Sequence, residues 1–412
     1  MEHWTIFTDN LSNPTRFITS FLNEDLPLGF EKFRNFTGVV LSQSKIDELI
    51  EEEERHDIKI ATKNKLQSLK SMSSGEQKKI VLSYLLKTHP DFIILDNPFD
   101  NLDVSSKEDL KMSLKKLASK LHLIVLISRK DDALDFIKNQ KRLTENDALI
   151  DEPNPIKEPN KKATERPFLH HLPQPLQTLV FPDKNLIRLK NICVTYDDKL
   201  VLNTINWAIN RGEFWQLKGK NGSGKTTLLS MITGENSKGY GQELFLFGQK
   251  KGSGESIWDI KKKIGYYAPT LTHNFYGAHT VEHMLISGLN DSIGLYKHPT
   301  EAQLNLAKEW LALLHMLPQK KALFIDLPIG QQRLIMVARA MIKHPLLLIL
   351  DEPTENLDDA SAALFVALIH KISKESDTAI LFVSHREERG LAPQKIFELQ
   401  KTENGSTGTI LK

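Results

Sequence analysis

The sequence predicts an α/β protein made of two related halves, each organised around a parallel β-sheet. Two internal matches support this fold class. Residues 89–103 match residues 344–358, with nine of the fifteen positions identical. Upstream of this match, residues 2–15 align with residues 213–226 without gaps. Because both matches occur in the same order, chance is a poor explanation, and we interpret the chain as a duplication whose first copy has diverged.

Composition sets limits on the class of protein. The 412 residues are 40% hydrophobic and 26% charged, with a formal net charge of +2, which gives no strong nucleic-acid signal. The one cysteine, Cys193, cannot form an internal disulfide, which fits a reducing compartment. No apolar run approaches the roughly 18 residues that a membrane-spanning helix needs. We therefore expect a soluble, cytoplasmic protein, which could still be peripheral at the inner face of a membrane.

The repeat and the composition together predict the organisation of the chain. We expect three segments, a degenerate first half at residues 1–141, a linker at residues 142–187 and a complete second half at residues 188–412. Most of the linker is rich in proline and polar residues and lacks a sustained helical or strand period. It contains His170 and His171, which we interpret as solvated side chains rather than metal ligands.

The second half contains a strand, a glycine-rich loop and a helix with the spacing GxxxxGK[ST] of a phosphate-binding loop. Glycines let the backbone N–H groups of such a loop turn toward an anion, and the helix N-terminus adds partial positive charge. We expect Lys225 to reach the β- and γ-phosphates of a nucleotide and Thr226 to ligate Mg²⁺. The residues predicted to contact the nucleotide are Gly219, Lys220, Asn221, Gly222, Ser223, Gly224, Lys225, Thr226 and Thr227.

Two further strands of the second half end in polar side chains. The apolar run at residues 346–350 is followed by Asp351 and Glu352, and the run at residues 379–383 leads to His385. A strand that ends in acids is often only a solvated strand end, but the phosphate loop favours a catalytic interpretation. We expect Asp351 to bind the metal, Glu352 to orient or deprotonate the attacking water, and His385 to contact the γ-phosphate.

These residues together resemble the ATP-binding cassette (ABC) family of P-loop NTPases. More narrowly, the chain is similar to tandem-cassette proteins named as molybdate-transport ATP-binding or photorepair proteins. The stretches that carry this closer resemblance lie at residues 264–266, 288–296, 330–333 and 343–345. The resemblance implies a parallel-sheet core and a helical subdomain in each half, and ATP hydrolysis with Mg²⁺. It also implies head-to-tail pairing of the halves within a monomer.

The family places each ATP between the phosphate loop of one half and a signature motif, LSGGQ in pattern, of the other half. Residues 72–77 fill the signature position in the first half, and residues 327–332 fill it in the second. The resemblance therefore implies that ATP held by Lys225 also contacts residues of the first half, namely Ser73, Gly75 and Glu76. It further implies that Tyr196, which precedes Lys225 by 29 residues, stacks on adenine.

The departures from the family pattern fall on one of the two expected sites. The signature serine of the second half is replaced by Pro328, and the phosphate-loop lysine of the first half by Pro14. The other aligned losses in the first half are Thr8, Leu11 and Asn13 for Gly219, Gly222 and Gly224, Asn97 for Glu352, and Arg129 for His385. The strands expected before the first loop have no counterpart, because the sequence starts at Met1. We predict one composite ATP site, formed by Lys225 and Ser73.

One departure affects the retained site, because Pro269 stands near the position of the family's glutamine that links nucleotide to partner. Two functions therefore stay open. The first is a peripheral ATPase that works with a membrane permease to import an oxyanion such as molybdate. The second is a cassette switch that acts on nucleic acid, the ribosome or another soluble machine. Glu352 and His385 argue against a third possibility, a scaffold with negligible turnover.

Overall fold

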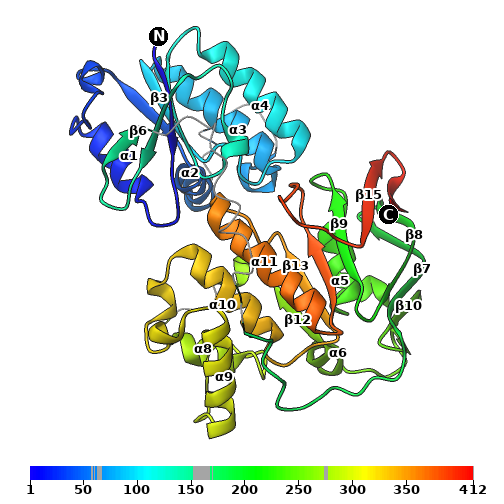
Figure 1. Cartoon of the computed structure of the whole chain (residues 1–412). Helices are drawn as coiled ribbons and strands as arrows, with labels where there is room; N and C mark the ends of the chain where they lie inside the picture. Colours follow the sequence, from blue (N-terminus) through cyan, green and yellow to red (C-terminus); the bar gives the residue numbers. More distant parts are fainter. Residues whose placement is uncertain are drawn as a thin grey trace. The chain divides into compact units, whose positions relative to one another are not determined.

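The computed structural model describes residues 1–56, 59, 61–62, 67–151, 168, 170–272 and 277–411. The chain divides into two compact units. The first comprises Met1–Asn160 with Glu355–Ser361, and the second comprises Lys161–Thr354 with Ala362–Lys412. Each unit has its own sheet flanked by helices (Figure 1), as the predicted α/β class requires. Among the described helices, none is long and apolar enough to cross a membrane.

The first unit contains a six-stranded sheet in the order β2-β3-β4-β1-β5-β6. All neighbouring strands are parallel except β6, which pairs antiparallel with β5. The strands are β1 (His3–Phe7), β2 (Gly38–Leu41), β3 (Phe92–Asp96), β4 (His122–Ile127), β5 (Asn139–Leu143) and β6 (Leu149–Asp151). The central strands β3 and β4 are almost wholly buried apolar runs, which is typical of a parallel sheet covered on both faces.

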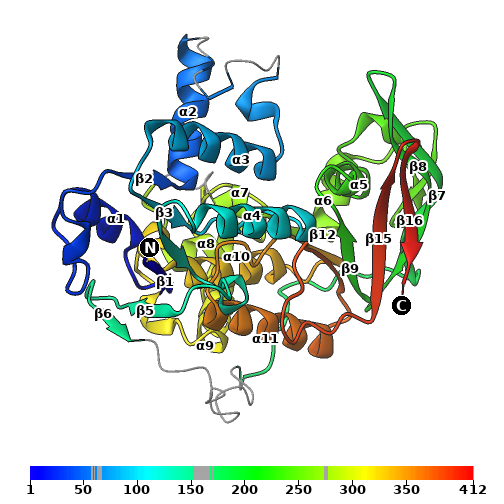
Figure 2. The same cartoon turned by 90° about the horizontal axis from the view of Figure 1, so that it is seen from above.

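Helices cover both faces of the first sheet. They are α1 (Pro14–Leu22), α2 (Gln43–His56), α3 (Ser74–Leu85) and α4 (Val104–Leu117). Alternate residues of β3 point to opposite faces, so Ile93 packs with side chains of α2, α3 and α4, while Ile94 packs with Phe17 and Phe21 of α1. In Figure 2, α2 and α3 lie together beside β2, as a small helical part of this unit.

The second unit contains a ten-stranded sheet in the order β11-β10-β7-β8-β16-β15-β9-β14-β13-β12. Its strands are β7 (Asn185–Tyr196), β8 (Lys199–Asn210), β9 (Phe214–Gly219), β10 (Glu243–Leu246), β11 (Gln249–Lys250), β12 (Ile264–Tyr267), β13 (Leu347–Asp351), β14 (Ala379–Val383), β15 (Lys395–Thr402) and β16 (Gly405–Ile410). Strands β9, β14, β13 and β12 form a parallel core, to which the largely antiparallel group of β7, β8, β10 and β11 is joined through β15 and β16.

Three helices of the second unit form a cluster of their own. The helices of this unit are α5 (Lys225–Ile232), α6 (Ile257–Lys263), α7 (Pro269–Thr272), α8 (Val281–Ser287), α9 (Glu301–Leu313), α10 (Ile329–Met341) and α11 (Asp359–Glu375). Helices α8, α9 and α10 pack on one another as a helical cluster (Figure 1). Within it, the buried Arg339 of α10 donates to Ser287 Oγ at 3.0 Å and to the carbonyl oxygen of Ser292 at 2.8 Å, which ties α10 to the end of α8.

The two sheets repeat one topology, which supports the predicted duplication. The order β2-β3-β4-β1-β5-β6 of the first unit corresponds strand for strand to β12-β13-β14-β9-β15-β16 of the second. The registers agree as well, since Gly38 pairs with Phe92 and Ile264 pairs with Leu347. The left-handed backbone also recurs at equivalent strand ends, with φ of 42° at Asn97 and 48° at Glu352.

The strand register corrects one part of the sequence alignment. Asp96 pairs with Leu126, and Asp351 pairs with Val383, so the counterpart of His385 is Ser128. The predicted match to Arg129 is wrong by one residue. Asp351 and Val383 are 32 positions apart, whereas Asp96 and Leu126 are 30 apart, so the second unit has two additional residues in this interval. The helix in the interval is also longer there, with 17 residues in α11 and 14 in α4.

The predicted linker, residues 142–187, includes paired strand residues at both ends. In the first sheet, β5 and β6 continue to Asp151, and in the second sheet β7 begins at Asn185. Residues 152–167 and 169 lie outside the described part of the chain. His170 is exposed, and the exposed His171 lies 3.5 Å from a carboxylate oxygen of Glu375.

Candidate functional site

The predicted phosphate loop connects β9 to α5 in the second unit. Its backbone requires glycine at two positions, because φ is 71° at Gly222 and 88° at Gly224, in the left-handed region that side chains disfavour. A third position is restricted by space. A Cβ atom on Gly219 would lie 2.5 Å from Ser223 Oγ and 3.0 Å from the carbonyl oxygen of Leu399. The loop therefore turns tightly and exposes backbone at Gly222, as a phosphate cradle needs.

Lys225 is the first residue of α5 and folds back over this loop. Its ammonium group donates to the carbonyl oxygen of Gly219 at 2.8 Å and to that of Lys220 at 3.4 Å. Thr226 follows in the first helical turn and is exposed. The amine, the loop backbone and the positive end of α5 thus gather at one place, where an anion is favoured.

Asp351 ends β13 in the second unit and is largely buried. Burial and the negative charge of Glu352 raise the pKa of Asp351 to about 6, while the hydroxyl of Tyr266 and the charge of Lys225 act in the opposite direction. The Tyr266 hydroxyl donates to Asp351 Oδ2 at 3.3 Å. A carboxylate in such surroundings is stabilised by a nearby cation. Its carboxylate oxygens and the hydroxyl oxygen of Thr226 are ligands of the type that Mg²⁺ prefers.

Glu352 and His385, both predicted to be catalytic, are in direct contact. His385 Nδ1 lies 3.0 Å from Glu352 Oε1, and the backbone N–H of His385 donates to Oε2 at 3.4 Å. The backbone of Glu352 has a positive φ of 48° and is held by a hydrogen bond from its N–H to the carbonyl oxygen of Val383 at 2.9 Å. Sparsely populated backbone of this kind is concentrated at functional sites. The imidazole is 9% exposed, and its Nε2 has no hydrogen-bond partner within the described structure.

Tyr196, predicted to stack on adenine, ends β7 and is 40% exposed. Asn236 Nδ2 donates to its hydroxyl at 2.9 Å, and Lys238 Nζ lies 5.9 Å from the ring centroid. These contacts hold the aromatic ring beside the segment that follows α5. Its role in base stacking stays a prediction.

The signature segment of the first unit forms a well-capped helix N-terminus. Ser73 precedes α3 and accepts a hydrogen bond from the N–H of Glu76, whose carboxylate accepts from the N–H of Ser73 at 3.0 Å. Ser73 is exposed, while Gly75 is buried and a Cβ atom there would lie 3.0 Å from Ser106 Oγ. In the second unit, the matching helix α10 follows Pro328 and has no side-chain cap. The first unit thus carries the intact signature.

In the first unit, the loop that corresponds to the phosphate loop is filled by its own carboxylate. Asp9 Oδ1 accepts from the backbone N–H groups of Leu11 at 3.0 Å and Ser12 at 2.9 Å. The side chain of Asn13 accepts from the N–H of Arg16 at 2.9 Å and caps α1. Backbone donors that a phosphate would need are therefore already used.

The role of Asp9, which aligns with Lys220, is a feature of the structure that was not predicted from the sequence. The signal was present, because aspartate and asparagine in loops commonly accept hydrogen bonds from backbone groups two or three residues further along.

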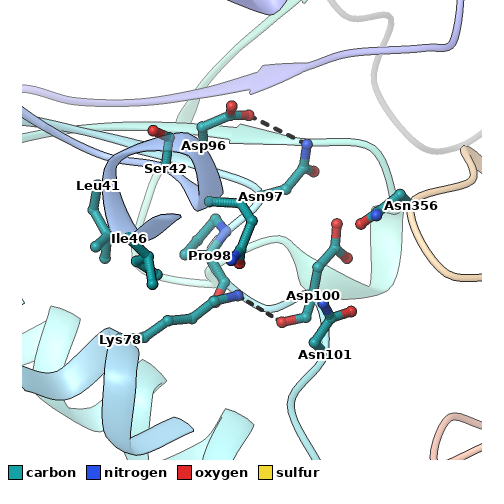
Figure 3. A pocket seen from close by; sticks show the side chains of 11 residues that line it. Leu41, Ser42, Ile46, Lys78, Asp96, Asn97, Pro98, Asp100, Asn101 and Asn356 are labelled. Carbon is teal, nitrogen blue, oxygen red and sulfur yellow. Dashed lines mark hydrogen bonds between the residues drawn. The ribbon is translucent and has the colours of Figure 1, made fainter. Parts of the chain in front are cut away.

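In the first unit, Asp96 and Asn97, the counterparts of Asp351 and Glu352, line a pocket of about 210 Å³ (Figure 3). The pocket is lined by Leu41, Ser42, Gln43, Ile46, Lys78, Asp96, Asn97, Pro98, Asp100, Asn101 and Asn356. Asn97 Nδ2 donates to Asp96 Oδ1 at 3.3 Å, and burial together with the charge of Asp100 raises the pKa of Asp96 to about 6. Asn97 cannot serve as a base for water. Gln43 lies in the frame of Pro269, because β2 and β12 share one register.

Comparisons with known proteins now identify the family. The family model described as "ABC transporter" matches residues 202–355. The ABC transporter ATP-binding protein ModF of Escherichia coli (strain K12) is 38% identical over 332 residues, which cover 77% of this chain and 67% of ModF. The chain belongs to the ABC ATP-binding family. An uncharacterised ABC transporter ATP-binding protein of Schizosaccharomyces pombe is 30% identical over 342 residues, covering 78% of this chain and 66% of that protein.

A solved structure that contains two ABC cassettes confirms the fold over the whole chain. Archaeal ABCE1, in a model of its ribosome-bound complex with Pelota, has a TM-score of 0.65 at 16% identity and covers 99% of this chain and 74% of that chain. At this identity the similarity concerns the fold alone. The chain spans about two thirds of the length of both ABC relatives named above.

Membership in the ABC family makes the chain an ATPase, as predicted, since ABC ATP-binding proteins hydrolyse ATP. Within the second unit, the structure brings together the predicted side chains of Glu352 and His385, and it places Lys225 near Asp351. The roles of the individual residues remain predictions.

We expect the variants Lys225→Ala and Glu352→Gln to separate binding from turnover. Lys225→Ala removes the cation from the phosphate loop and should abolish ATP binding. Glu352→Gln removes only the carboxylate that orients water, so it should keep binding and lower turnover by on the order of 10²–10⁴-fold. Calorimetric titration with ATP and an assay of phosphate release measure the two effects. Turnover near the parent rate in Glu352→Gln would show that Glu352 is not the catalytic carboxylate.

We also expect one tightly bound ATP per chain. In the Glu352→Gln protein, calorimetry with Mg²⁺ and ATP should give a stoichiometry near one, because Asp9 fills the loop of the first unit and Pro14 replaces its lysine. Adding Asp9→Ala should leave the stoichiometry near one, since emptying the loop does not restore an amine. A two-site isotherm in the Glu352→Gln protein would contradict the asymmetry of the two halves.

Proposed function

We propose that the chain binds and hydrolyses Mg·ATP at one composite site. The phosphate loop of the second unit holds the nucleotide, and Ser73, Gly75 and Glu76 of the first unit complete the site. The observation that carries this proposal is the distribution of intact and lost elements. The open glycine loop occurs in one unit and the capped signature helix in the other. The other possible composite site would combine the loop of the first unit, which is filled by Asp9, with the signature helix of the second unit, which has no side-chain cap at Pro328.

Each retained residue has a chemical role in this proposal. Lys225 and the loop backbone bind the β- and γ-phosphates, and Thr226 and Asp351 hold Mg²⁺. When bound, the metal ion neutralises charge on the phosphates. Glu352 orients the attacking water and accepts its proton. His385, whose Nδ1 lies 3.0 Å from Glu352 Oε1, contacts the γ-phosphate. Lys220, Asn221, Ser223 and Thr227 complete the phosphate loop, and Tyr196 supports the base.

The signature residues supply a further electrostatic contribution. Ser73 is exposed at the N-terminus of α3, where backbone N–H groups and the helix dipole favour negative charge. Donors that are already oriented stabilise charge that moves during phosphoryl transfer. The halves therefore work as one enzyme, and we propose that the chain acts as a monomer.

In the cell, we propose that the chain is a cytoplasmic ATPase, peripheral at the inner face of the membrane, which works with a permease subunit that imports a molybdate-like oxyanion. The similarity to an ABC transporter ATP-binding protein over 77% of the chain supports a transport role. The resemblance to tandem-cassette proteins named for molybdate transport supports the substrate class.

A second candidate function is a cassette switch that acts on the ribosome, nucleic acid or another soluble machine. Pro269 favours it, because the family's coupling glutamine is absent from the half that holds the phosphate loop, whereas Gln43 stands at the same position in the other half. Copurification of the full chain separates the two functions. A permease subunit in the membrane fraction supports the transport role, and ribosomes or DNA support the switch.

The composite site predicts opposite results for two signature variants. Ser73→Arg should place a bulky cation where α3 meets ATP and lower hydrolysis by on the order of 10²-fold. Pro328→Ser, which restores the missing serine in the second unit, should change hydrolysis less than twofold, since the loop it would serve is filled by Asp9.

A matched control for Ser73→Arg is Ser83→Arg, which adds the same side chain to an exposed position further along α3. It should leave hydrolysis unchanged. Thermal melting of each variant accounts for the lost helix cap, worth about 1 kcal/mol. Full ATPase activity in folded Ser73→Arg protein, or a large gain in Pro328→Ser protein, would refute the composite site.

A further inference from the structure

Tyr266 holds the side chain of the acid that ends the neighbouring strand. Strand β12 pairs in parallel with β13, and Tyr266 lies opposite Ile349, two residues before Asp351. From this register, the Tyr266 hydroxyl reaches the carboxyl end of β13 and donates to Asp351 Oδ2 at 3.3 Å. The contact connects adjacent strands rather than neighbours in sequence, so the sheet register fixes it.

The ring of Tyr266 is itself held in place. It is partly buried and packs against the main hydrophobic core of the second unit. Its phenolic hydroxyl can donate a hydrogen bond, and Asp351 Oδ2 is the acceptor that it contacts. A rigid aromatic ring that ends in a hydrogen-bond donor restricts the plane of the carboxylate it contacts.

The first unit offers an internal comparison. There, Val40 lies opposite Ile94 in the same register and carries no hydroxyl. The equivalent acid, Asp96, instead accepts from the side chain of Asn97 at 3.3 Å. The hydroxyl donor thus occurs in the unit with the open phosphate loop, while the unit with the carboxylate-filled loop uses an amide at the catalytic position.

We propose that Tyr266 is a positioning residue for the metal-binding carboxylate of Asp351. By holding Oδ2, it restricts rotation of the carboxylate that would bind the metal, and so would contribute to the part of ATP affinity that depends on Mg²⁺. This inference rests on the proposed function, in which Asp351 binds the metal. Outer partners that orient a metal ligand are typically worth about 10–100-fold in metal affinity.

The test compares ATP binding with and without metal in the Glu352→Gln protein, which binds without turnover. The dissociation constant of ATP is measured by calorimetry in excess EDTA and again at saturating Mg²⁺. The ratio of the two constants gives the tightening due to the metal. Tyr266→Phe, which removes only the hydroxyl, should leave the constant in EDTA within twofold and reduce the tightening by on the order of 10-fold.

The neighbouring residue provides a matched control. Tyr267 is fully buried on the same strand, and its hydroxyl accepts a hydrogen bond from Arg333 of α10. Tyr267→Phe should therefore lower the melting temperature by leaving a buried donor without this acceptor, and should not change the tightening due to metal. Equal loss of tightening in both variants would show that strand stability, rather than the Tyr266 hydroxyl, sets the metal dependence.

A third variant separates the inference from the function on which it rests. Asp351→Asn should remove most of the tightening due to Mg²⁺. If Asp351→Asn removes it and Tyr266→Phe retains it in full, the inference is wrong and the metal role of Asp351 stands. If Asp351→Asn keeps the tightening, the proposed metal site itself is wrong. If Tyr266→Phe weakens ATP binding equally in EDTA and in Mg²⁺, the hydroxyl supports nucleotide binding in a way that does not depend on metal, and the inference is overturned.

Discussion

Parallel pairing of β9, β14 and β13 is the constraint on which the site depends. Because parallel strands end at the same edge of a sheet, this pairing places the phosphate loop after Gly219, the imidazole of His385 and the acids Asp351 and Glu352 within one small region of the second unit. No two of these segments are close in sequence. The register brings Asp351 opposite Val383, and the backbone hydrogen bond from Glu352 to Val383 then fixes the turn that carries the Glu352 carboxylate.

The first unit keeps this scaffold after losing the chemistry. Its strands β1, β4 and β3 have the same order and register, and Asn97 retains the left-handed backbone of Glu352. The two units differ in the group that accepts hydrogen bonds from the backbone N–H groups of the loop at the phosphate-loop position, which joins β1 to α1 in the first unit. In place of an external anion, the Asp9 carboxylate accepts the loop N–H groups. These loop N–H groups are therefore satisfied without an external anion, as the proposed composite site requires of the first unit.

Much of this organisation follows from the sequence, because its signals are local. The glycine loop, the buried strands that end at Asp351 and Val383, and the capping pattern at Ser73 each lie within about a dozen residues. The features that the sequence did not predict depend on distant pairing. Tyr266 meets Asp351 only through sheet register. Likewise, only the strand pairing shows that Ser128, rather than Arg129, corresponds to His385. The last two residues of β5 and all of β6 fall within the predicted linker, because such short strands show no sustained apolar period.

Asp96 and Asp351, two partly buried acids at equivalent strand ends, allow the two units to be compared. Burial raises the pKa of both Asp96 and Asp351 to about 6, so each carboxylate costs free energy when it is ionised. In the second unit, Lys225 and the Tyr266 hydroxyl lower that cost for Asp351. In the first unit, Lys78 and the amide of Asn97 lower the cost of ionising Asp96. Pro14, at the position of Lys225, brings no charge to the loop between β1 and α1. An acid with a raised pKa at this strand end is therefore common to both units, and the cation at the adjacent loop is found at Lys225 in the second unit, where we propose that Mg·ATP binds.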